Sequence, residues 1–352
     1  MATKTPTPTK KTPIKSTPSK TSTQPTNTKP PMSSFMIALN FTLILFFIIL
    51  SVIALYFAYL NIPGEPQELN IDLSSQRESP EPTQQAQAIK QFYPNMKFNH
   101  NNITYIIDFM CSQEKKQRVL KAMETISIKV PQITFLPTQL NPDIEVSCSE
   151  EHKDSVKEDF FIAGEGGAKE IIKTKDHNII TNGVILLYQE SNNAKECEWP
   201  NIEIHELMHV FGFGHSENEN SLMYPYLESC NQKLDLSITN KLKELYSQEN
   251  LPDFYFEDIN ATKKGRYLDF ETVIKNSGTI DATNITLTIL DNQEVAETKI
   301  IKELKFGAGI ILRIQNLKLI HKNPKEITFI LNKNNEIKEL DTKNNILKIN
   351  LD

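Results

Sequence analysis

The strongest constraint on the fold of this chain lies in eleven residues, HELMHVFGFGH, which run from His205 to His215. On a helix, residues four apart share one face, so His205 and His209 can present their imidazoles to one metal ion. Gly212 follows three residues later, where the chain must leave the helix and turn back sharply, and glycine tolerates such a turn best. That turn can bring His215 in as a third ligand. The spacing therefore predicts a helix, a tight turn and a three-histidine metal site.

Glu206 stands next to the first of these ligands, where it can polarise a metal-bound water without binding the metal itself. Three protein ligands with one open position are typical of catalytic zinc, because structural zinc usually takes four protein ligands. The alternative interpretation is a structural helix with three incidental histidines. A chance match becomes much rarer once both the glycine and the third histidine are required. The pattern therefore favours a hydrolytic zinc site.

A second motif follows the third histidine: Ser221 to Pro225 reads Ser-Leu-Met-Tyr-Pro, which fits a turn with a buried methionine under the metal site. HExxHxxGxxH followed by such a Met-turn resembles the metzincin zinc peptidases, and Leu-Met-Tyr-Pro is most similar to their matrixin branch. The likeness extends over roughly 92–248 through an opening ITYIID, a DIEV strand and a closing helix. It implies zinc ligands, a general base and a Met-turn at His205, His209 and His215, Glu206 and Met223.

The resemblance also implies that Pro225 and Tyr226 wall the pocket for the residue after the scissile bond. Matrixins place one residue between that proline and tyrosine, whereas here the two are adjacent. The histidine-rich segment that holds a second, structural zinc in matrix metalloproteinases has no counterpart, since only two histidines, His152 and His177, stand between 150 and the motif. One catalytic zinc is therefore expected, and calcium is left open.

The fold expected for 91–250 is the α+β metzincin peptidase domain, a twisted mixed sheet with helices. Hydrophobic spacing supports it with a helix over 113–129, strands near 103–107, 133–136, 143–146 and 183–189, and a last helix from Leu236. The Gly-rich stretch Gly164–Ala168 and its continuation to Thr174 fall where the family has its substrate-pairing edge strand, which adds a peptide through main-chain hydrogen bonds. The alternative is a plain surface loop.

The N-terminal part has two different compositions. Residues 1–34 hold Thr, Pro, Ser and six lysines but no acidic residue, which predicts a disordered tail. Residues 35–60 contain no charge and, as a helix of roughly 39 Å, are long enough to cross a ~30 Å hydrocarbon core. A cleaved signal peptide should have a shorter apolar core of about 7–15 residues and a small-residue cleavage site. An uncleaved transmembrane helix is therefore favoured.

Charge around this apolar stretch predicts its orientation. The lysines all precede it, while Glu65, Glu68 and Asp72 follow it. The positive-inside bias then puts the N-terminus in the cytoplasm and the rest of the chain outside, in a single-pass protein of the cell membrane. Residues 61–90 are rich in Pro, Glu, Gln and Ser, and are expected to form a flexible stalk.

Residues 254–352 change character to short alternating strands separated by turn signals, without a concentration of His, Asp or Cys. The spacing predicts an all-β, immunoglobulin-like sandwich of about seven strands. The segments NSGTIDATNITLTI and IKELDTKNN resemble the CARDB domains of prokaryotic surface proteins. The resemblance implies a surface or adhesion partner, substrate docking, or a spacer.

The chain has four cysteines, all within the expected peptidase domain. An even number on the outer side of a membrane suggests two disulfides, and four cysteines allow three pairings. Cys197–Cys230 would clasp the two sides of the metal site, and Cys111–Cys148 would join neighbouring strands; this pairing is favoured. Free thiols in a reducing compartment are the alternative.

Composition limits the remaining functions. A net charge of −6 and a pI near 5.8, without a basic stripe among aromatic residues, argue against nucleic acid as a partner. The sequence predicts a membrane-anchored zinc metalloendopeptidase with protein or peptide substrates. The competing class is a catalytically weak or inactive binding protein on a peptidase scaffold, which loss of Glu206 or of a ligand would favour, and neither is lost.

Overall fold

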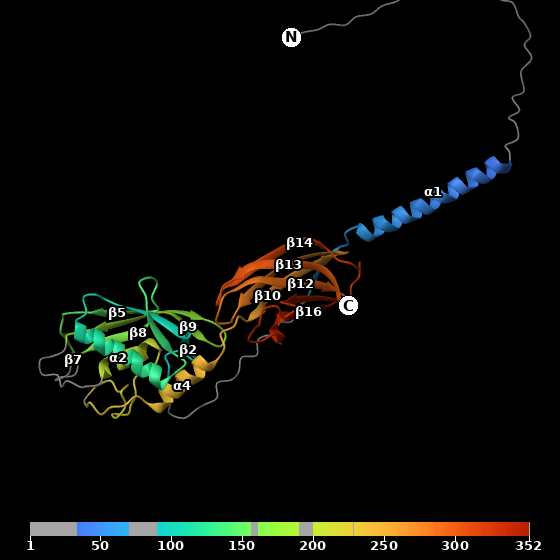
Figure 1. Cartoon of the computed structure of the whole chain (residues 1–352). Helices are drawn as coiled ribbons and strands as arrows, with labels where there is room; N and C mark the ends of the chain where they lie inside the picture. The colour runs from blue at the N-terminus through green and yellow to red at the C-terminus, as the bar shows by residue number, and fades with distance from the viewer. Residues whose placement is uncertain (1–33, 70–89, 156–160, 190–199, 228, 352) are drawn as a thin grey trace, which may run out of the picture. The chain divides into compact units, whose positions relative to one another are not determined.

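The computed structural model describes residues 34–69, 90–155, 161–189, 200–227 and 229–351. Its first element is one long helix, α1 (Ser34–Asn61), which is drawn in blue in Figure 1. Within residues 36–61 of this helix, an 18-residue window has a mean hydropathy of 2.8, and none of that window is buried by other parts of the chain. By length and composition, α1 could cross a membrane, and a signal sequence would meet the same criteria. The predicted tail, 1–34, lies outside the described residues except for Ser34.

Helices and a mixed sheet form the part of the chain from β2 to α4 (Figure 1). Its elements are β2 (Met96–Phe98), β3 (Asn102–Ile107), α2 (Gln113–Lys129), β4 (Thr134–Pro137), β5 (Ile144–Cys148), β6 (Lys153–Asp154), β7 (Phe161–Ile162), β8 (Gly164–Lys173), β9 (Asn178–Leu187), α3 (Asn201–Val210) and α4 (Leu236–Ser247). The strands β2, β3, β4, β5 and β9 pair in parallel, while β8 pairs antiparallel with β9. This is the α+β architecture that the sequence predicted.

Local signals explain the position of helix α2. Ser112 precedes it, and the Ser112 hydroxyl accepts a hydrogen bond from the Lys115 amide, as an N-cap does. The apolar residues Val119, Ala122, Met123 and Ile126 recur at helical spacing and are buried. They join one hydrophobic core with residues of the parallel strands and of α3, so α2 covers the sheet on the side where α3 also packs.

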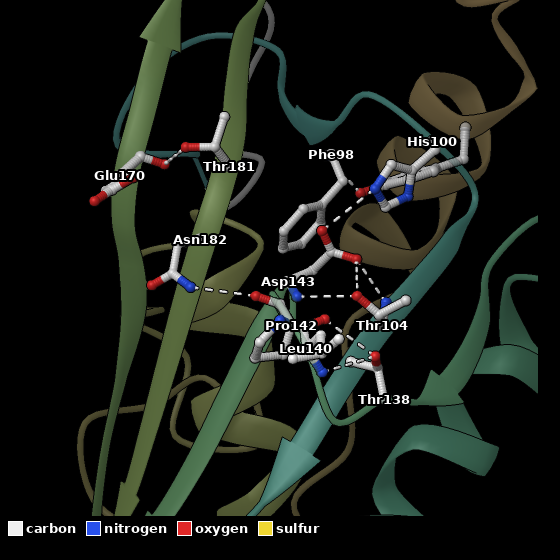
Figure 2. A network of polar contacts seen from close by, with 11 residues as sticks. Phe98, His100, Thr104, Thr138, Leu140, Pro142, Asp143, Glu170, Thr181 and Asn182 are labelled. Carbon is white, nitrogen blue, oxygen red and sulfur yellow. Dashed lines mark hydrogen bonds and ion pairs between the residues drawn. The ribbon is translucent and has the colours of Figure 1, made fainter.

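Asp143, the residue before β5, is bonded to two neighbouring strands, and Figure 2 shows the contacts of its carboxylate with Thr104 and His100. The Asp143 carboxylate accepts hydrogen bonds from the amide and the hydroxyl of Thr104 on β3, both at 2.6 Å, and lies 3.3 Å from His100 Nε2. The Asp143 carbonyl accepts from the amide of Gly183 on β9 at 2.7 Å. Burial by itself would raise the pKa of the Asp143 carboxyl, but the hydrogen bonds from His100 and Thr104 outweigh it. The pKa therefore lies below its ordinary value of 3.8.

Asp143→Ala should lower the free energy of unfolding by about 1–3 kcal/mol at pH 7, because two donors of Thr104 and one of His100 lose their acceptor. A group with a lowered pKa stabilises the fold fully above its unfolded value, and the stabilisation is lost as pH falls through the folded value. The urea midpoints of the two proteins should therefore converge below pH 3.8. Asp176→Ala, at an exposed aspartate, is the control. An equal difference at pH 7 and pH 2.5 would contradict this role.

The C-terminal part is all-β, as the sequence predicted. Seven of its strands come from this part of the chain: β10 (Phe254–Lys264), β11 (Tyr267–Asn276), β12 (Ala282–Asp291), β13 (Glu294–Leu304), β14 (Gly309–Lys318), β15 (Glu326–Leu331) and β16 (Ile346–Asn350), the last preceded by a short 3₁₀ helix, η2 (Lys343–Asn345). They form two four-stranded antiparallel sheets together with β1 (Pro66–Leu69), in the orders β1-β10-β11-β14 and β13-β12-β15-β16. Apolar side chains from both sheets share one core.

Strand β1 differs from the expectation of a flexible stalk over 61–90. Pro66–Leu69 pair antiparallel with Ala261–Lys264 at the edge of the first sheet. The pairing is main-chain, so a Pro-, Glu- and Gln-rich segment can make it without a hydrophobic pattern. Residues 70–89 of the predicted stalk lie outside the described residues. The C-terminal sheet therefore takes its edge strand from a segment that precedes β2 in the chain.

Candidate metal centre

Helix α3 and the turn after it hold the three predicted ligands. Nine of its ten residues are buried, including His205 and His209, whose rings lie one turn apart. The helix ends before Gly212, which has a φ of +84°. A Cβ at this glycine would also lie 2.3 Å from Met96 Sδ. Both the backbone angle and the close approach of Met96 therefore require glycine at the turn, as the sequence predicted.

The turn brings His215 to the other two histidines. The Nε2 atoms are separated by 3.0 Å (His205–His209), 3.2 Å (His209–His215) and 3.3 Å (His205–His215). Three nitrogens bound tetrahedrally to zinc at about 2.0–2.1 Å would stand about 3.3 Å apart. The spacing of the triad therefore fits a zinc ion.

The protonation of two rings is fixed by the main chain. His205 Nδ1 lies 2.7 Å from the Leu222 carbonyl oxygen, and His209 Nδ1 lies 2.7 Å from that of Phe213. A carbonyl oxygen only accepts, so each Nδ1 carries the proton and each Nε2 presents a lone pair to the centre. Burial lowers the pKa of His205 to about 3 and also lowers the pKa of His209 and of His215. Three neutral imidazoles with converging lone pairs are a suitable ligand set for a zinc ion.

Glu206 lies beside the triad under the edge strand β8. Its side chain is 6% exposed, and burial, followed by the charge of Glu165, raises the pKa of the carboxyl to about 8. The Gly166 amide donates a hydrogen bond to this carboxylate. A cation in the triad would favour the ionised form of a carboxyl so close to it. Glu206 is thus a buried carboxyl on the helix that carries His205 and His209, and it directly follows His205.

Two glycines of β8 let the strand lie directly on Glu206. A Cβ at Gly164 would come 2.8 Å from Glu206 Cγ, and one at Gly166 would come 2.3 Å from the Glu206 carbonyl oxygen. The sequence predicted an edge strand here, with a surface loop as the alternative. Nothing in the sequence indicated that the glycines lie against Glu206. Strand β8 pairs with β9 over its length and with none of the other described strands, so its second edge carries no sheet partner among them.

The Met-turn lies where the resemblance implied. Met223 is fully buried in the core, its carbonyl accepts from the Ser216 amide at 2.7 Å, and the preceding residue, Leu222, supplies the acceptor for His205. Pro225 is exposed, and the Tyr226 ring lies 6.0 Å from that of Tyr224. Leu222 thus links this turn to His205, while the Met-turn role of Met223 and the pocket role of Pro225 and Tyr226 stay predictions.

The sequence did not indicate two sets of contacts that hold the Met-turn loop and helix α3. Gln232 is buried, and its amide donates to the carbonyls of Glu219, Ser221 and Tyr226 at 3.0, 3.2 and 3.0 Å, which closes the Met-turn loop. Arg118 on α2 forms an ion pair of 3.0 Å with Glu203 on α3, whose side chain is 3% exposed. Neither a lone glutamine nor an Arg–Glu pair 85 positions apart leaves a pattern in one sequence.

Disulfides flank the site. Cys111 and Cys148 are bonded across the ends of β3 and β5, which is the pairing the sequence analysis favoured. Cys230 is also disulfide-bonded, and its expected partner, Cys197, lies outside the described residues. Parallel pairing of β3 with β5 explains the first bond, since it brings the two cysteines to the same edge of the sheet.

Comparisons with known proteins agree with this geometry. Residues 97–247 match the family model of the matrixins, and residues 251–349 match the CARDB model. Over 105 residues the chain is 26% identical to the metalloendoproteinase 4-MMP of Arabidopsis thaliana, which covers 29% of this chain and 30% of that protein. The chain thus matches about a third of the length of this curated relative.

Two solved structures of archaeal domains are similar to part of this chain. A domain of a putative cell surface protein from Methanosarcina acetivorans is 15% identical, with a TM-score of 0.23, over 28% of this chain and 91% of that one. The CARDB domain of a Pyrococcus furiosus protein is also 15% identical, with a TM-score of 0.24, over 29% and 94%. By the family models alone, the chain has a match to the matrixins over 97–247, the part that includes the three histidines and Glu206, followed by a match to CARDB over 251–349.

Proposed function

We propose that this protein is a zinc-dependent endopeptidase that is anchored in a membrane by α1. The observation that carries the proposal is the convergence of three Nε2 atoms within 3.3 Å of one another beside the buried carboxyl of Glu206. Ligand spacing alone would also fit a structural zinc, but such a site usually has a fourth protein ligand. The matrixin match supports peptide hydrolysis over other zinc chemistry.

The residues around the triad suit peptide hydrolysis. A zinc ion held by the three histidines would supply a Lewis acid for the peptide carbonyl and for the attacking water. Glu206 accepts a proton from that water and returns it to the leaving amine. The Gly166 amide holds the carboxylate in place through this transfer. A main-chain amide thus orients the Glu206 carboxylate, and no second side chain is needed to hold it.

Strand β8 is the proposed binding edge for the substrate. Its outer edge has no sheet partner among the described strands, and an extended peptide can add to such an edge through main-chain hydrogen bonds. The strand lies on Glu206 through Gly164 and Gly166, so a peptide paired with it runs past the proton acceptor. Pro225 and Tyr226 are proposed to wall the pocket for the residue after the scissile bond.

Cleavage of a peptide library by the full-length chain in detergent tests this function. We expect cuts at internal bonds that stop on addition of 1,10-phenanthroline and return when zinc is restored. Metal content is measured on the same sample. A protein with one zinc per chain that cuts nothing would instead be a binding protein on a peptidase scaffold, and cleavage that resists the chelator would exclude a zinc mechanism.

The membrane topology can be tested separately. Lysines before residue 35 and acidic residues after 60 favour a cytoplasmic N-terminus, with the matrixin and CARDB domains outside. Protease added to intact cells should then digest epitopes placed in either domain and spare an epitope at the N-terminus. Detergent-permeabilised cells, in which both epitopes are digested, are the control. Protection of the matrixin domain in intact cells would contradict the proposed topology.

The CARDB domain is proposed to act in spacing or in contacts with a surface partner. Its two sheets share an apolar core, and the described residues of this domain contain no group of three metal-ligating side chains like the histidine triad. Peptide hydrolysis is therefore assigned to the matrixin domain alone.

A further inference from the structure

The segment that enters the matrixin domain, Lys90–Phe92, lies against the turn between the second and third histidines. The Phe92 amide donates to the Gly212 carbonyl at 2.7 Å, and the Gly214 amide donates to the Lys90 carbonyl at 3.1 Å. Gln91 forms an antiparallel bridge with Phe213. Three consecutive residues of the segment thus follow the turn from Gly212 to Gly214 as a short strand would.

The Gln91 side chain adds contacts with the end of helix α3. Its amide nitrogen donates to the Phe211 carbonyl at 2.9 Å and to the Met96 carbonyl at 2.8 Å. Its amide oxygen accepts from the Met96 amide at 3.0 Å. Met96 in turn fills the space over Gly212. Gln91 therefore joins Phe211, the residue before Gly212, to Met96 of strand β2, which packs on Gly212.

Phe92 extends this contact to a ligand itself. Its ring stacks on the ring of His209, with centroids 6.3 Å apart and an interplanar angle of 26°. The Phe92 side chain is 62% exposed, so it covers His209 from the solvent side without belonging to the core.

The position of His215 depends on the backbone around it more than the positions of His205 and His209 do. His205 and His209 each donate Nδ1–H to a carbonyl, whereas the described residues offer His215 no hydrogen bond at Nδ1. His215 is also exposed. Its position is therefore set by the backbone on its two sides, where Gly214 is bound to Lys90 and Ser216 to Met223. The same turn supplies the Phe213 carbonyl that orients His209.

We infer that Lys90–Phe92 forms an outer support of the metal centre, with Gln91 as a positioning residue for His215 and Phe92 as a cover for His209. The inference rests on the proposed zinc site. Without this support the turn keeps its own hydrogen bonds, but its distance from helix α3 can vary. A zinc ion would then lose the optimal position of one ligand, which shortens its residence in the site.

Zinc release tests the inference. The full-length chain in detergent is loaded with zinc and mixed with an excess of a colorimetric chelator, and the release rate is followed. We expect Gln91→Met, which keeps the shape and removes the hydrogen bonds, to release zinc about 10-fold faster, the lower end of the effect of outer-shell changes. Phe92→Ala, at a largely exposed position, should release zinc several-fold faster with the fold intact. Gln132→Met, at a half-buried glutamine that donates to Ser247, is the matched control.

Two further readouts separate positioning from general stability. In cobalt-loaded protein, Gln91→Met should change the visible absorption bands, which report ligand geometry, and kcat for a peptide should fall with KM nearly unchanged. A purely structural role would lower the Tm of the metal-free and loaded forms equally and leave release and spectrum at wild-type values. That result, or wild-type release rates in both variants, would overturn the inference. If the wild-type chain binds no zinc, the proposed function itself has failed.

Discussion

Glu206→Gln should reduce kcat/KM for a cleavable peptide by about 10²–10⁴-fold and leave the zinc content at the wild-type level, because the amide cannot accept the proton of the attacking water. The substitution keeps the size of the side chain, and its amide oxygen can still accept from the Gly166 amide. The buried position under Gly164 and Gly166 is therefore preserved, and the fold should be unchanged. The initial rate of cleavage and the metal content of the same preparation are the measurements.

Glu217→Gln is the matched control for this substitution. Glu217 is an exposed carboxylate two residues after His215, so it shares the local sequence but not the buried position of Glu206. Its rate should stay within about twofold of the wild-type rate. If Glu206→Gln cleaved at the wild-type rate with zinc bound, another group would have to accept the proton, and the assignment of Glu206 as general base would be wrong.

His209→Ala should bring the zinc content from about one per chain to near zero, and peptidase activity should vanish with it. His209 is the candidate ligand whose Nε2 lies within 3.2 Å of both other Nε2 atoms, so its loss leaves only two histidines for the metal. A ligand that binds only the folded state stabilises it by RT ln(1 + [L]/Kd), where [L] is the free ligand concentration. Zinc should therefore raise the Tm of the wild-type protein and leave that of the variant unchanged.

His177→Ala is the control that shows whether removing a histidine outside the triad also lowers the zinc content. His177 lies outside the triad, where its Nε2 contacts Gln248 at 2.9 Å, and its replacement should leave one zinc per chain. Full zinc retention in His209→Ala would exclude the three-histidine site. Loss of zinc in both variants would show that unfolding, and not ligation, is being measured.

Much of the fold could be predicted because its signals are local. Helix α2 begins and ends where the apolar spacing placed it, at Gln113 and Lys129. Seven alternating strands were expected after 254, and β10–β16 supply seven. Both signals come from residues within one turn or one strand of each other, and burial of a single face produces them directly.

Strand β1, in contrast, has no local sequence signal that predicts it. Pro66–Leu69 pair through main-chain atoms with residues nearly 200 positions further along the chain. Their side chains have no alternating pattern, because most of them are exposed and only Leu69 packs against the core. A segment of this composition is indistinguishable by sequence from a stalk, and the neighbouring strand alone decides its structure.

The sequence by itself determined the candidate metal ligands, the general-base candidate and the order of helix and turn, because all of them lie within 19 consecutive residues, 205–223, whose geometry a helix and one glycine largely dictate. The tertiary structure decided what surrounds them: Gln91 on the turn, Gln232 on the Met-turn, and Gly164 and Gly166 on Glu206. These contacts join segments up to 120 positions apart. A glutamine or a glycine has no distinctive spacing in the chain, so its role arises only when packing brings it against the site.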